Sequence, residues 1–272
     1  MIREMTLGQY YKADSVLHRL DPRVKLAGTV LYVISLFLPK NVLALAIATL
    51  FLILIIRMSK VPWKMIVRGV KPLLFIIIFS AIVNLFTVKG VVICHIWRFR
   101  ITREGIWMAA FLTIRLIYLV MGTSIMTFTT TPNQLTDGLE KSLGFLKVIH
   151  IPVHELAMMM SIALRFIPIL TEELDKIMKA QMSRGASFNE GNLMQKAKQI
   201  VPILVPLFVS AIRRASDLAL AMDARCYNGG VGRTRMHPLV YERRDRVAYV
   251  ILLLYLCIMI LVSCLLRIGA IR

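Results

Sequence analysis

The sequence is short of acidic residues and of cysteines, and each shortage excludes classes of protein. Its 272 residues include 34 lysines and arginines but only 15 aspartates and glutamates, which gives a formal net charge of +19. The four cysteines form no C-x-x-C pair and belong to no cluster of cysteines and histidines. We therefore expect neither a disulfide framework nor a metal site.

Motifs of common enzymes are also missing. His154-Glu155 begins like H-E-x-x-H, but Met158 occupies the position of the second histidine that this zinc motif needs. The chain has neither the G-x-x-x-x-G-K-[ST] loop that cradles nucleotide phosphates nor a G-x-S-x-G serine elbow. The sequence therefore predicts a protein with no catalytic site and no cofactor.

Apolar residues are abundant instead, and they make up 58% of the chain. Soluble domains contain about 45–50%. The apolar residues form long blocks that basic connectors separate, and lysine and arginine in such connectors suit an anionic membrane surface better than nucleic acid. The composition predicts a multi-pass protein of the cell membrane that contacts the lipid bilayer and no nucleic acid.

Five apolar blocks are predicted to cross the bilayer as helices. They cover residues 24–38, 42–56, 72–88, 105–128 and 247–266. Asp21-Pro22 suits a helix start, because aspartate caps a helix and proline fits its first position. The first two blocks are short for a bilayer that needs about 17–25 helical residues, so Lys25 and Arg57 are expected to lengthen them by snorkelling. Alternating residues between the third and fourth blocks predict a short hairpin.

Basic residues set the expected orientation of these spans. They place the N-terminal arm and the second connector in the cytoplasm. The third connector disagrees, since it is basic although this topology puts it outside. The predicted domains are residues 1–128 (N-terminal arm and four spans), 129–246 (a cytoplasmic coupling domain of long helices) and 247–272 (the fifth span and the C-terminus).

Two long helices are predicted inside the cytoplasmic domain, over residues 152–184 and 193–225. Their apolar portions run about 13–15 residues, which is too short to cross a membrane. Charged residues concentrate toward the C-terminal end of each helix. Pro168, Pro202 and Pro206 are expected to bend them. The pattern is typical of rods that start at the membrane face and project into water.

The two rods end alike in sequence. The first ends Ser183-Arg184-Gly185 and the second ends Ala224-Arg225-Cys226, so each arginine follows a small residue. A single end of this kind is explained by an arginine that complements the helix dipole and a glycine that caps the helix. Two matching ends favour paired docking sites, because an exposed arginine can make bidentate contacts in a partner's pocket.

One ionisable residue falls inside a predicted span. Arg115 lies in the fourth block, and Asn84 of the third block is its candidate partner. A charged residue at membrane depth either serves function or makes a structural hydrogen bond between helices. Both interpretations stay open.

Several long strings of this sequence resemble a known family. These strings are residues 15–25, 135–140, 153–157 and 163–168, together with both rod ends. They resemble the transmembrane T component of energy-coupling factor (ECF) transporters, which import vitamins and related micronutrients. The resemblance implies a non-catalytic coupling subunit that docks on two ABC-type ATPase subunits through Ser183-Arg184-Gly185 and Ala224-Arg225-Cys226. It also implies a substrate-binding membrane subunit as partner.

The sequence departs from the family's motif at one position, and three alternative functions remain. Cys226 stands where the family has glycine, which puts the cap geometry of the second end in doubt. Methionine-rich rods favour the shared type of T component, which serves several interchangeable substrate-binding subunits. A T component dedicated to cobalt or nickel is the nearest alternative. A self-sufficient secondary transporter needs charged or broken helices at mid-membrane, and a membrane hydrolase needs a nucleophile–base pair.

Overall fold

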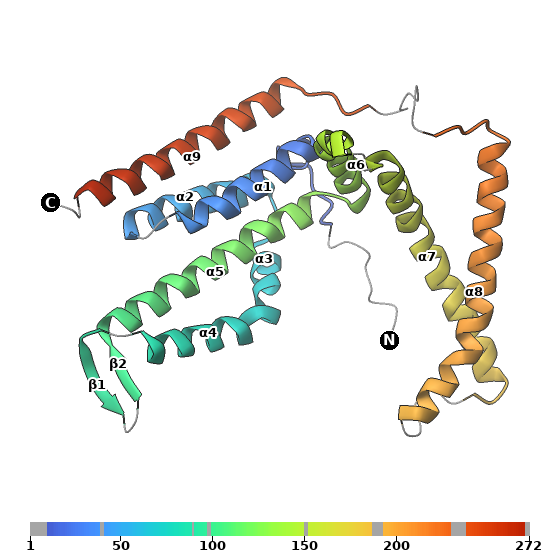
Figure 1. The fold of residues 1–272 in the computed structure, drawn as a ribbon, viewed down its shortest axis with the longest axis horizontal. Coiled ribbons are helices and arrows are strands. Elements are labelled where there is room, and N and C mark those ends of the chain that lie inside the picture. The colour runs from blue at the N-terminus through green and yellow to red at the C-terminus, as the bar shows by residue number, and fades with distance from the viewer. Residues whose placement is uncertain are drawn as a thin grey trace. The chain divides into compact units, whose positions relative to one another are not determined.

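The computed structural model describes residues 10–38, 41–88, 90–96, 99–149, 152–186, 193–229 and 238–269. The chain divides into two compact units (Figure 1). One unit contains Met1–Leu139 together with Leu239–Arg272, and the other contains Glu140–Pro238. The domains predicted from the sequence refer to membrane boundaries, which this division does not test, so they stay predictions.

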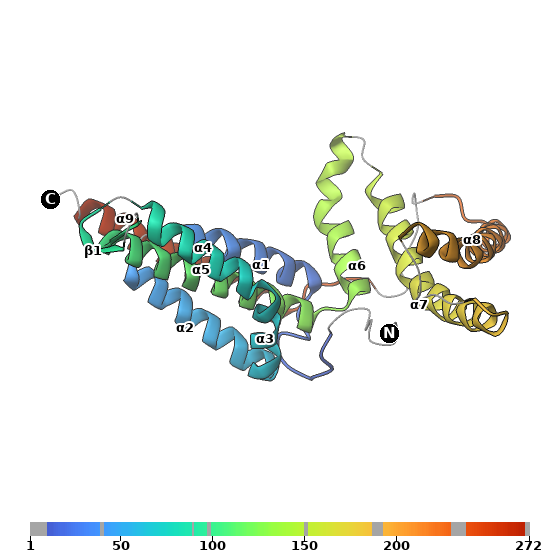
Figure 2. The same cartoon turned by 90° about the horizontal axis from the view of Figure 1, so that it is seen from below.

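Helices form most of the first unit. In chain order they are α1 (Pro22–Phe37), α2 (Val42–Ser59), α3 (Trp63–Val70), α4 (Leu74–Thr87), α5 (Arg103–Thr129), α6 (Pro132–Ser142), which continues into the second unit, and α9 (Arg243–Gly269). A 3-10 turn over Lys71–Leu73 joins α3 to α4. The long helices α1, α2, α4, α5 and α9 run alongside one another (Figures 1 and 2).

The hairpin predicted between the third and fourth apolar blocks is present. Strands β1 (Val92–Ile96) and β2 (Phe99–Thr102) pair antiparallel. Thr102 ends β2 and starts α5, because its hydroxyl accepts a hydrogen bond from the N–H of Gly105 (3.1 Å). The same hydroxyl donates to the carbonyl of Val88 (2.8 Å), which fixes the end of α4 against the start of α5.

The start of α1 confirms one sequence prediction and contradicts another. Asp21 caps the helix by accepting from the N–H of Arg23 (2.9 Å), and Pro22 takes the first helical position. Lys25 does not snorkel, because its side chain is buried and its ammonium group donates to the carbonyls of His18 (3.1 Å) and Thr129 (2.9 Å). The two carbonyl groups accept hydrogen bonds from the buried ammonium group of Lys25, so the prediction that this side chain snorkels was wrong.

The core of the first unit follows one face of α2. Ala44, Ala48, Leu52 and Ile56 are spaced four residues apart, so they share a helix face, and all four are buried. This face meets α5 and α9, both of which contact α2. The two alanines allow the backbones to approach closely, which is how helices associate where lipid supplies no hydrophobic driving force.

Five helical stretches of the described chain are long and apolar enough to cross a membrane. They are Val42–Ser59, Trp63–Thr87, Arg103–Thr129, Val153–Ser183 and Arg243–Leu265. The predicted all-α membrane fold with about five spans is confirmed, yet the set of helices differs. α1 has only 16 residues and is not in this set. The helix at residues 153–183, which the sequence predicted to be too short, does qualify by length and composition.

The second unit is built around two long helices. They are α7 (Val153–Ser183) and α8 (Leu193–Asp223), each of 31 residues, and a 3-10 segment over Leu143–Ile149 precedes them. Prolines lie inside both helices, at Pro168 in α7 and at Pro202 and Pro206 in α8. Figure 1 shows α8 changing direction within its N-terminal half, which contains its two prolines.

Candidate functional site

The first candidate docking end is the C-terminus of α7. The N–H of Gly185 donates to the carbonyl of Met182 (3.0 Å), and the N–H of Ala186 donates to the carbonyl of Gln181 (3.1 Å). These two bonds form a Schellman motif. Gly185 adopts the left-handed conformation that the motif requires, at φ +89°, and Arg184 is the C-cap residue before it.

The C-terminus of α8 forms the same motif. The N–H of Cys226 donates to the carbonyl of Asp223 (2.9 Å), and the N–H of Tyr227 donates to the carbonyl of Met222 (3.1 Å). Cys226 is left-handed at φ +57°, so it keeps the cap geometry that the sequence left in doubt. A side chain in this region costs about 1–2 kcal/mol relative to the right-handed conformation. The motif places Arg225 directly before the left-handed residue.

The two ends therefore present their arginines in the same register. Arg184 and Arg225 are both exposed, and neither forms an ion pair with another described residue. The small residues before them, Ser183 and Ala224, are exposed as well, and the Ser183 hydroxyl donates back to the carbonyl of Lys179 (3.1 Å). Each end thus offers one guanidinium group with little steric cover around it, which suits insertion into a pocket.

α7 and α8 pack antiparallel in the second unit. Glu173 and Arg214 form an ion pair at 3.1 Å, and the side-chain amide of Gln181 donates to the carbonyl of Pro202 (3.3 Å). That carbonyl has no donor within α8, because Pro206, four residues later, lacks an N–H. A side chain of α7 therefore satisfies a backbone group that proline has orphaned in α8.

The antiparallel packing separates the two candidate docking ends. Gln181, close to the end of α7, contacts α8 at Pro202, whereas Arg225 lies beyond the far end of α8. At 1.5 Å per residue these two places are about 35 Å apart along α8. The ends of α7 and α8 also lie well apart in Figure 1. One partner domain of ordinary size can therefore occupy each end.

Two contacts of Arg115 are with aromatic rings. Its guanidinium group lies over the ring of Phe111 at 4.9 Å and over that of Phe37 at 5.8 Å. Asn84, the partner predicted from the sequence, donates its amide to the carbonyl of Ser80 in its own helix (2.8 Å). These two cation–π contacts stabilise the charge of Arg115.

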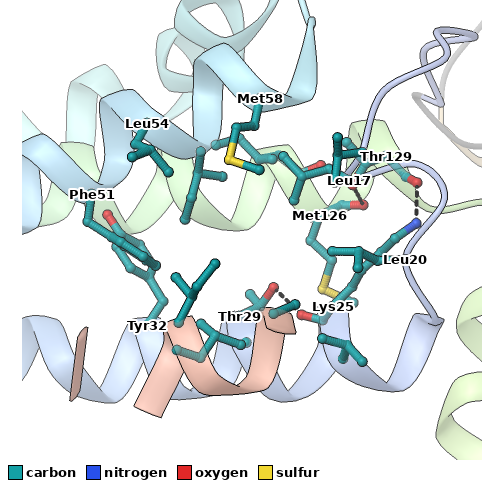
Figure 3. A pocket seen from close by; sticks show the side chains of 18 of the residues that line it. Leu17, Leu20, Lys25, Thr29, Tyr32, Phe51, Leu54, Met58, Met126 and Thr129 are labelled. Carbon is teal, nitrogen blue, oxygen red and sulfur yellow. Dashed lines mark hydrogen bonds between the residues drawn. The ribbon is translucent and has the colours of Figure 1, made fainter. Parts of the chain in front are cut away.

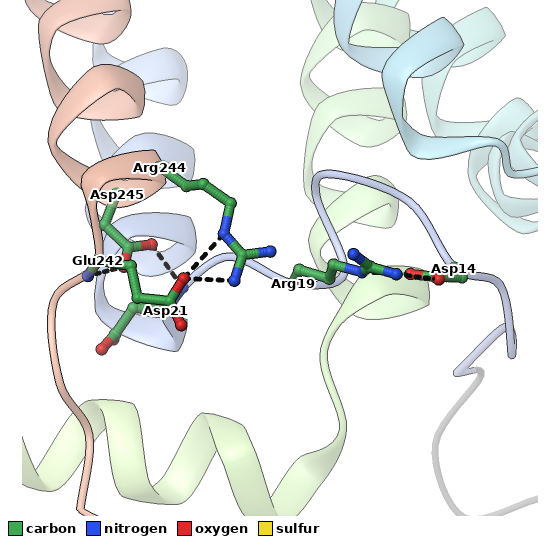
Figure 4. A network of polar contacts seen from close by, with 6 residues as sticks. All are labelled: Asp14, Arg19, Asp21, Glu242, Arg244 and Asp245. Carbon is green, nitrogen blue, oxygen red and sulfur yellow. Dashed lines mark hydrogen bonds and ion pairs between the residues drawn. The ribbon is translucent and has the colours of Figure 1, made fainter.

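Sequence reasoning missed a buried polar network at the start of α9. Asp245 is 3% exposed and accepts hydrogen bonds from the N–H groups of Asp21 (2.9 Å) and Glu242 (2.8 Å) (Figure 4). It caps α9 and ties that helix to the start of α1. The spacing of Glu242 and Asp245 before an apolar run is the signal that could have found this cap.

His154 of the zinc-like motif is hydrogen-bonded to a carboxylate. The ring Nδ1 atom of His154 lies 3.0 Å from a carboxylate oxygen of Glu140, and both side chains are largely buried. Among the residues described here, no three histidine, cysteine or acidic side chains gather as a metal site. The pair joins the end of α6 to the start of α7.

These features define an all-α, multi-pass membrane protein with two matched, arginine-bearing helix ends. Comparison with known proteins gives its family. The family model described as "Cobalt transport protein" matches residues 13–238. The chain is similar to the energy-coupling factor transporter transmembrane protein EcfT of Clostridium kluyveri, with 49% identity over 263 residues, 96% of this chain and 97% of that protein.

Two further relatives bear the same name. The EcfT protein of Acidaminococcus fermentans is 49% identical over 254 residues, which cover 93% of this chain and 94% of the relative. That of Bacillus subtilis is 46% identical over 246 residues, 90% of this chain and 93% of the relative. The chain belongs to the family of transmembrane components of energy-coupling factor transporters, as its sequence strings predicted.

Proposed function

We propose that this chain is the coupling subunit of an ECF-type importer. It passes the ATP-driven motion of two ABC-type ATPase subunits to a substrate-binding membrane subunit, which carries a vitamin or related micronutrient inward. One observation carries this proposal: α7 and α8 end in the same Schellman motif, with an exposed arginine at the same position of each. Two equivalent ends suit two equivalent partners.

The docking role is assigned to six residues. They are Ser183, Arg184, Gly185, Ala224, Arg225 and Cys226. The motif fixes the backbone on both sides of each arginine, so binding restricts the arginine side chain but need not order the backbone. Each arginine would make charge-assisted hydrogen bonds to carboxylates or carbonyls in a groove of one ATPase subunit.

The packing of α7 against α8 supports transmission of motion. The Glu173–Arg214 ion pair and the Gln181–Pro202 hydrogen bond join the helices at two levels. A displacement of either end therefore moves a joined pair of helices. For such a displacement to do work, the substrate-binding subunit must contact the pair differently in the two states of the ATPases.

We also propose that the second unit lies on the cytoplasmic side, where the ATPases are. α7 is apolar near its start and long enough to cross a membrane, but that portion includes Glu155 and Arg165. Charged residues at membrane depth cost several kcal/mol. α7 therefore rests its apolar start against the bilayer and projects its polar end into water, in agreement with the basic N-terminal arm and second connector.

A second candidate function rests on the description of the matching family model. "Cobalt transport protein" favours a T component dedicated to a metal importer, with one substrate-binding subunit in place of several. Purification of the tagged chain from its native membrane separates the two functions. The shared type should co-purify with two ATPase subunits and several different substrate-binding subunits, whereas the dedicated type should bring one.

The same preparation tests the coupling role itself. Reconstituted into vesicles with its co-purified partners, the chain should support substrate uptake that requires ATP. The isolated chain should hydrolyse no ATP, because the sequence contains no G-x-x-x-x-G-K-[ST] loop, and it should bind no vitamin, because the proposed substrate site lies on a partner subunit. ATP turnover by the isolated chain would contradict the proposal.

A further inference from the structure

An apolar cavity lies inside the first unit, between α1, α2, α5 and α9 (Figure 3). Its volume is about 430 Å³, which falls within the range of small-molecule sites, about 300–1,000 Å³. Almost all of its wall is carbon. The polar side chains on the wall have partners of their own: the hydroxyl of Thr29 donates to the carbonyl of Lys25 (2.8 Å), and the ammonium of Lys25 donates to two carbonyls.

One end of the cavity is closed by stacked rings. The ring of Phe51 stacks on that of Tyr255 at 3.9 Å, and the ring of Tyr32 lies beside it. Gly122 of α5 admits the Tyr32 ring, because a Cβ atom there would lie 2.2 Å from it. Tyr255 is held in turn by the hydroxyl of Ser35 at 3.0 Å. These contacts hold the three rings in place at the closed end of the cavity.

The end of the cavity opposite the rings lies beside the first turn of α9, where Leu17 and Leu20 of the N-terminal arm and two cationic side chains line it. Arg243 and Arg244 line the cavity there, and both are exposed. Arg244 pairs with Glu242, but both partners are about half exposed, so the ion pair is weak and can be exchanged for another anion. The nearby carboxylate of Asp245 is buried and occupied by two backbone N–H groups. This end of the cavity therefore presents positive charge beside an apolar interior.

We propose that this cavity binds one acyl chain of an anionic phospholipid, whose phosphate is held by Arg243 and Arg244. The carbon wall offers water almost no hydrogen-bonding partners, and the bilayer around these helices supplies apolar chains. Arginine matches a phosphate with bidentate hydrogen bonds, and basic pockets between spanning helices bind lipid head groups. The site is separate from the six docking residues, and the proposal does not depend on the coupling function.

Native mass spectrometry of the purified full chain tests the site with dioleoyl phosphatidylglycerol as the probe and dioleoyl phosphatidylcholine as its neutral counterpart. Phosphatidylglycerol should bind preferentially. Ala248→Phe places a ring in the cavity and should weaken binding about tenfold or more, whereas Val250→Phe, on the outer face of the same helix, should leave it unchanged. The two variants add the same ring two residues apart.

The arginine pair is tested in the same way, with a variant that does not alter packing. Arg243→Gln/Arg244→Gln should weaken phosphatidylglycerol binding about tenfold or more and abolish the preference over phosphatidylcholine. Arg246→Gln removes an equally exposed charge of the same turn that does not line the cavity, and should have no effect.

Four results would overturn the proposal. Undiminished binding to Ala248→Phe would exclude the cavity, and equal binding of the two lipids would exclude the arginines as the head-group site. Competition by glycerol 3-phosphate at the affinity of the whole lipid would show a phosphate site with no acyl chain. Loss of the lipid when the partner subunits assemble would assign the cavity to a partner's segment.

Discussion

Reversing the charge of Arg184 and Arg225 distinguishes a docking site from an ordinary helix cap. Both arginines are exposed and form no ion pair with a described residue, so the fold loses only their interaction with the helix dipole. That loss is about 0.3–1 kcal/mol per site. If each arginine docks in an ATPase, Arg184→Glu or Arg225→Glu instead removes a hydrogen-bonded charge contact between proteins, which costs about 2–5 kcal/mol of association.

The separation of the two ends makes the double variant informative. The end of α7 contacts α8 at Pro202, about 35 Å along α8 from Arg225. The losses of association at the two ends should therefore add, because coupling between substitutions fades beyond about 10 Å. The double variant should therefore lose about 4–10 kcal/mol of association, enough to abolish co-purification of the ATPases and nearly all uptake. Each single variant should retain one docked end and partial uptake.

The assay combines co-purification of the ATPases, uptake into vesicles and thermal unfolding of the isolated chain. Arg213→Glu is the matched control, since Arg213 is exposed on the same helix as the second end but lies away from it. Its association and uptake should match those of the unchanged chain. Full association and uptake by the double variant, with normal unfolding, would refute the docking role of both ends.

Further substitutions test other parts of the structure. Asp245→Ala leaves two backbone N–H groups without their acceptor and should lower the free energy of unfolding by about 1.5–3 kcal/mol in a denaturation experiment, with Asp245→Asn intermediate. Arg214→Ala should cost less than about 1 kcal/mol in the same experiment, because its ion pair with Glu173 is partly exposed. Cys226→Gly should raise the unfolding temperature, since glycine removes about 1 kcal/mol of left-handed strain, and should leave ATPase co-purification intact. Ser183→Cys, in a background without the native cysteines, should resist a membrane-impermeant thiol reagent added to intact cells, and labelling there would contradict the cytoplasmic placement.

Local signals in the sequence predicted local structure well. The Asp21-Pro22 start of α1 and the hairpin before α5 are both present, because each depends on residues close together in the chain. The two helix ends were also recognisable, since a Schellman motif needs only a few consecutive residues. That Cys226 keeps the left-handed conformation of glycine required the structure, because its identity alone does not fix φ.

Contacts between distant segments were not predictable in the same way. Lys25 is satisfied by the carbonyl of Thr129, more than a hundred residues later, so its burial cannot be read from its neighbours in sequence. Arg115 lies over the rings of Phe111 in its own helix and Phe37 of α1, whereas Asn84 bonds to Ser80 in its own helix. For α7, an apolar start of sufficient length coexists with charged residues, so composition alone does not decide whether it crosses the membrane.

The position of the contacts that join α7 and α8 determines how far each helix extends on either side of them. The joining contacts centre near Ile177 of α7 and Phe208 of α8, midway between the ion pair and the hydrogen bond. At 1.5 Å per residue, α7 has about 10 Å on its docking side and about 36 Å on the other, whereas the arms of α8 are about 25 and 22 Å. A small tilt of α7 is thus magnified about three- to fourfold at its far end. If the two ends dock as proposed, equal displacements at them would therefore move α7 and α8 unequally.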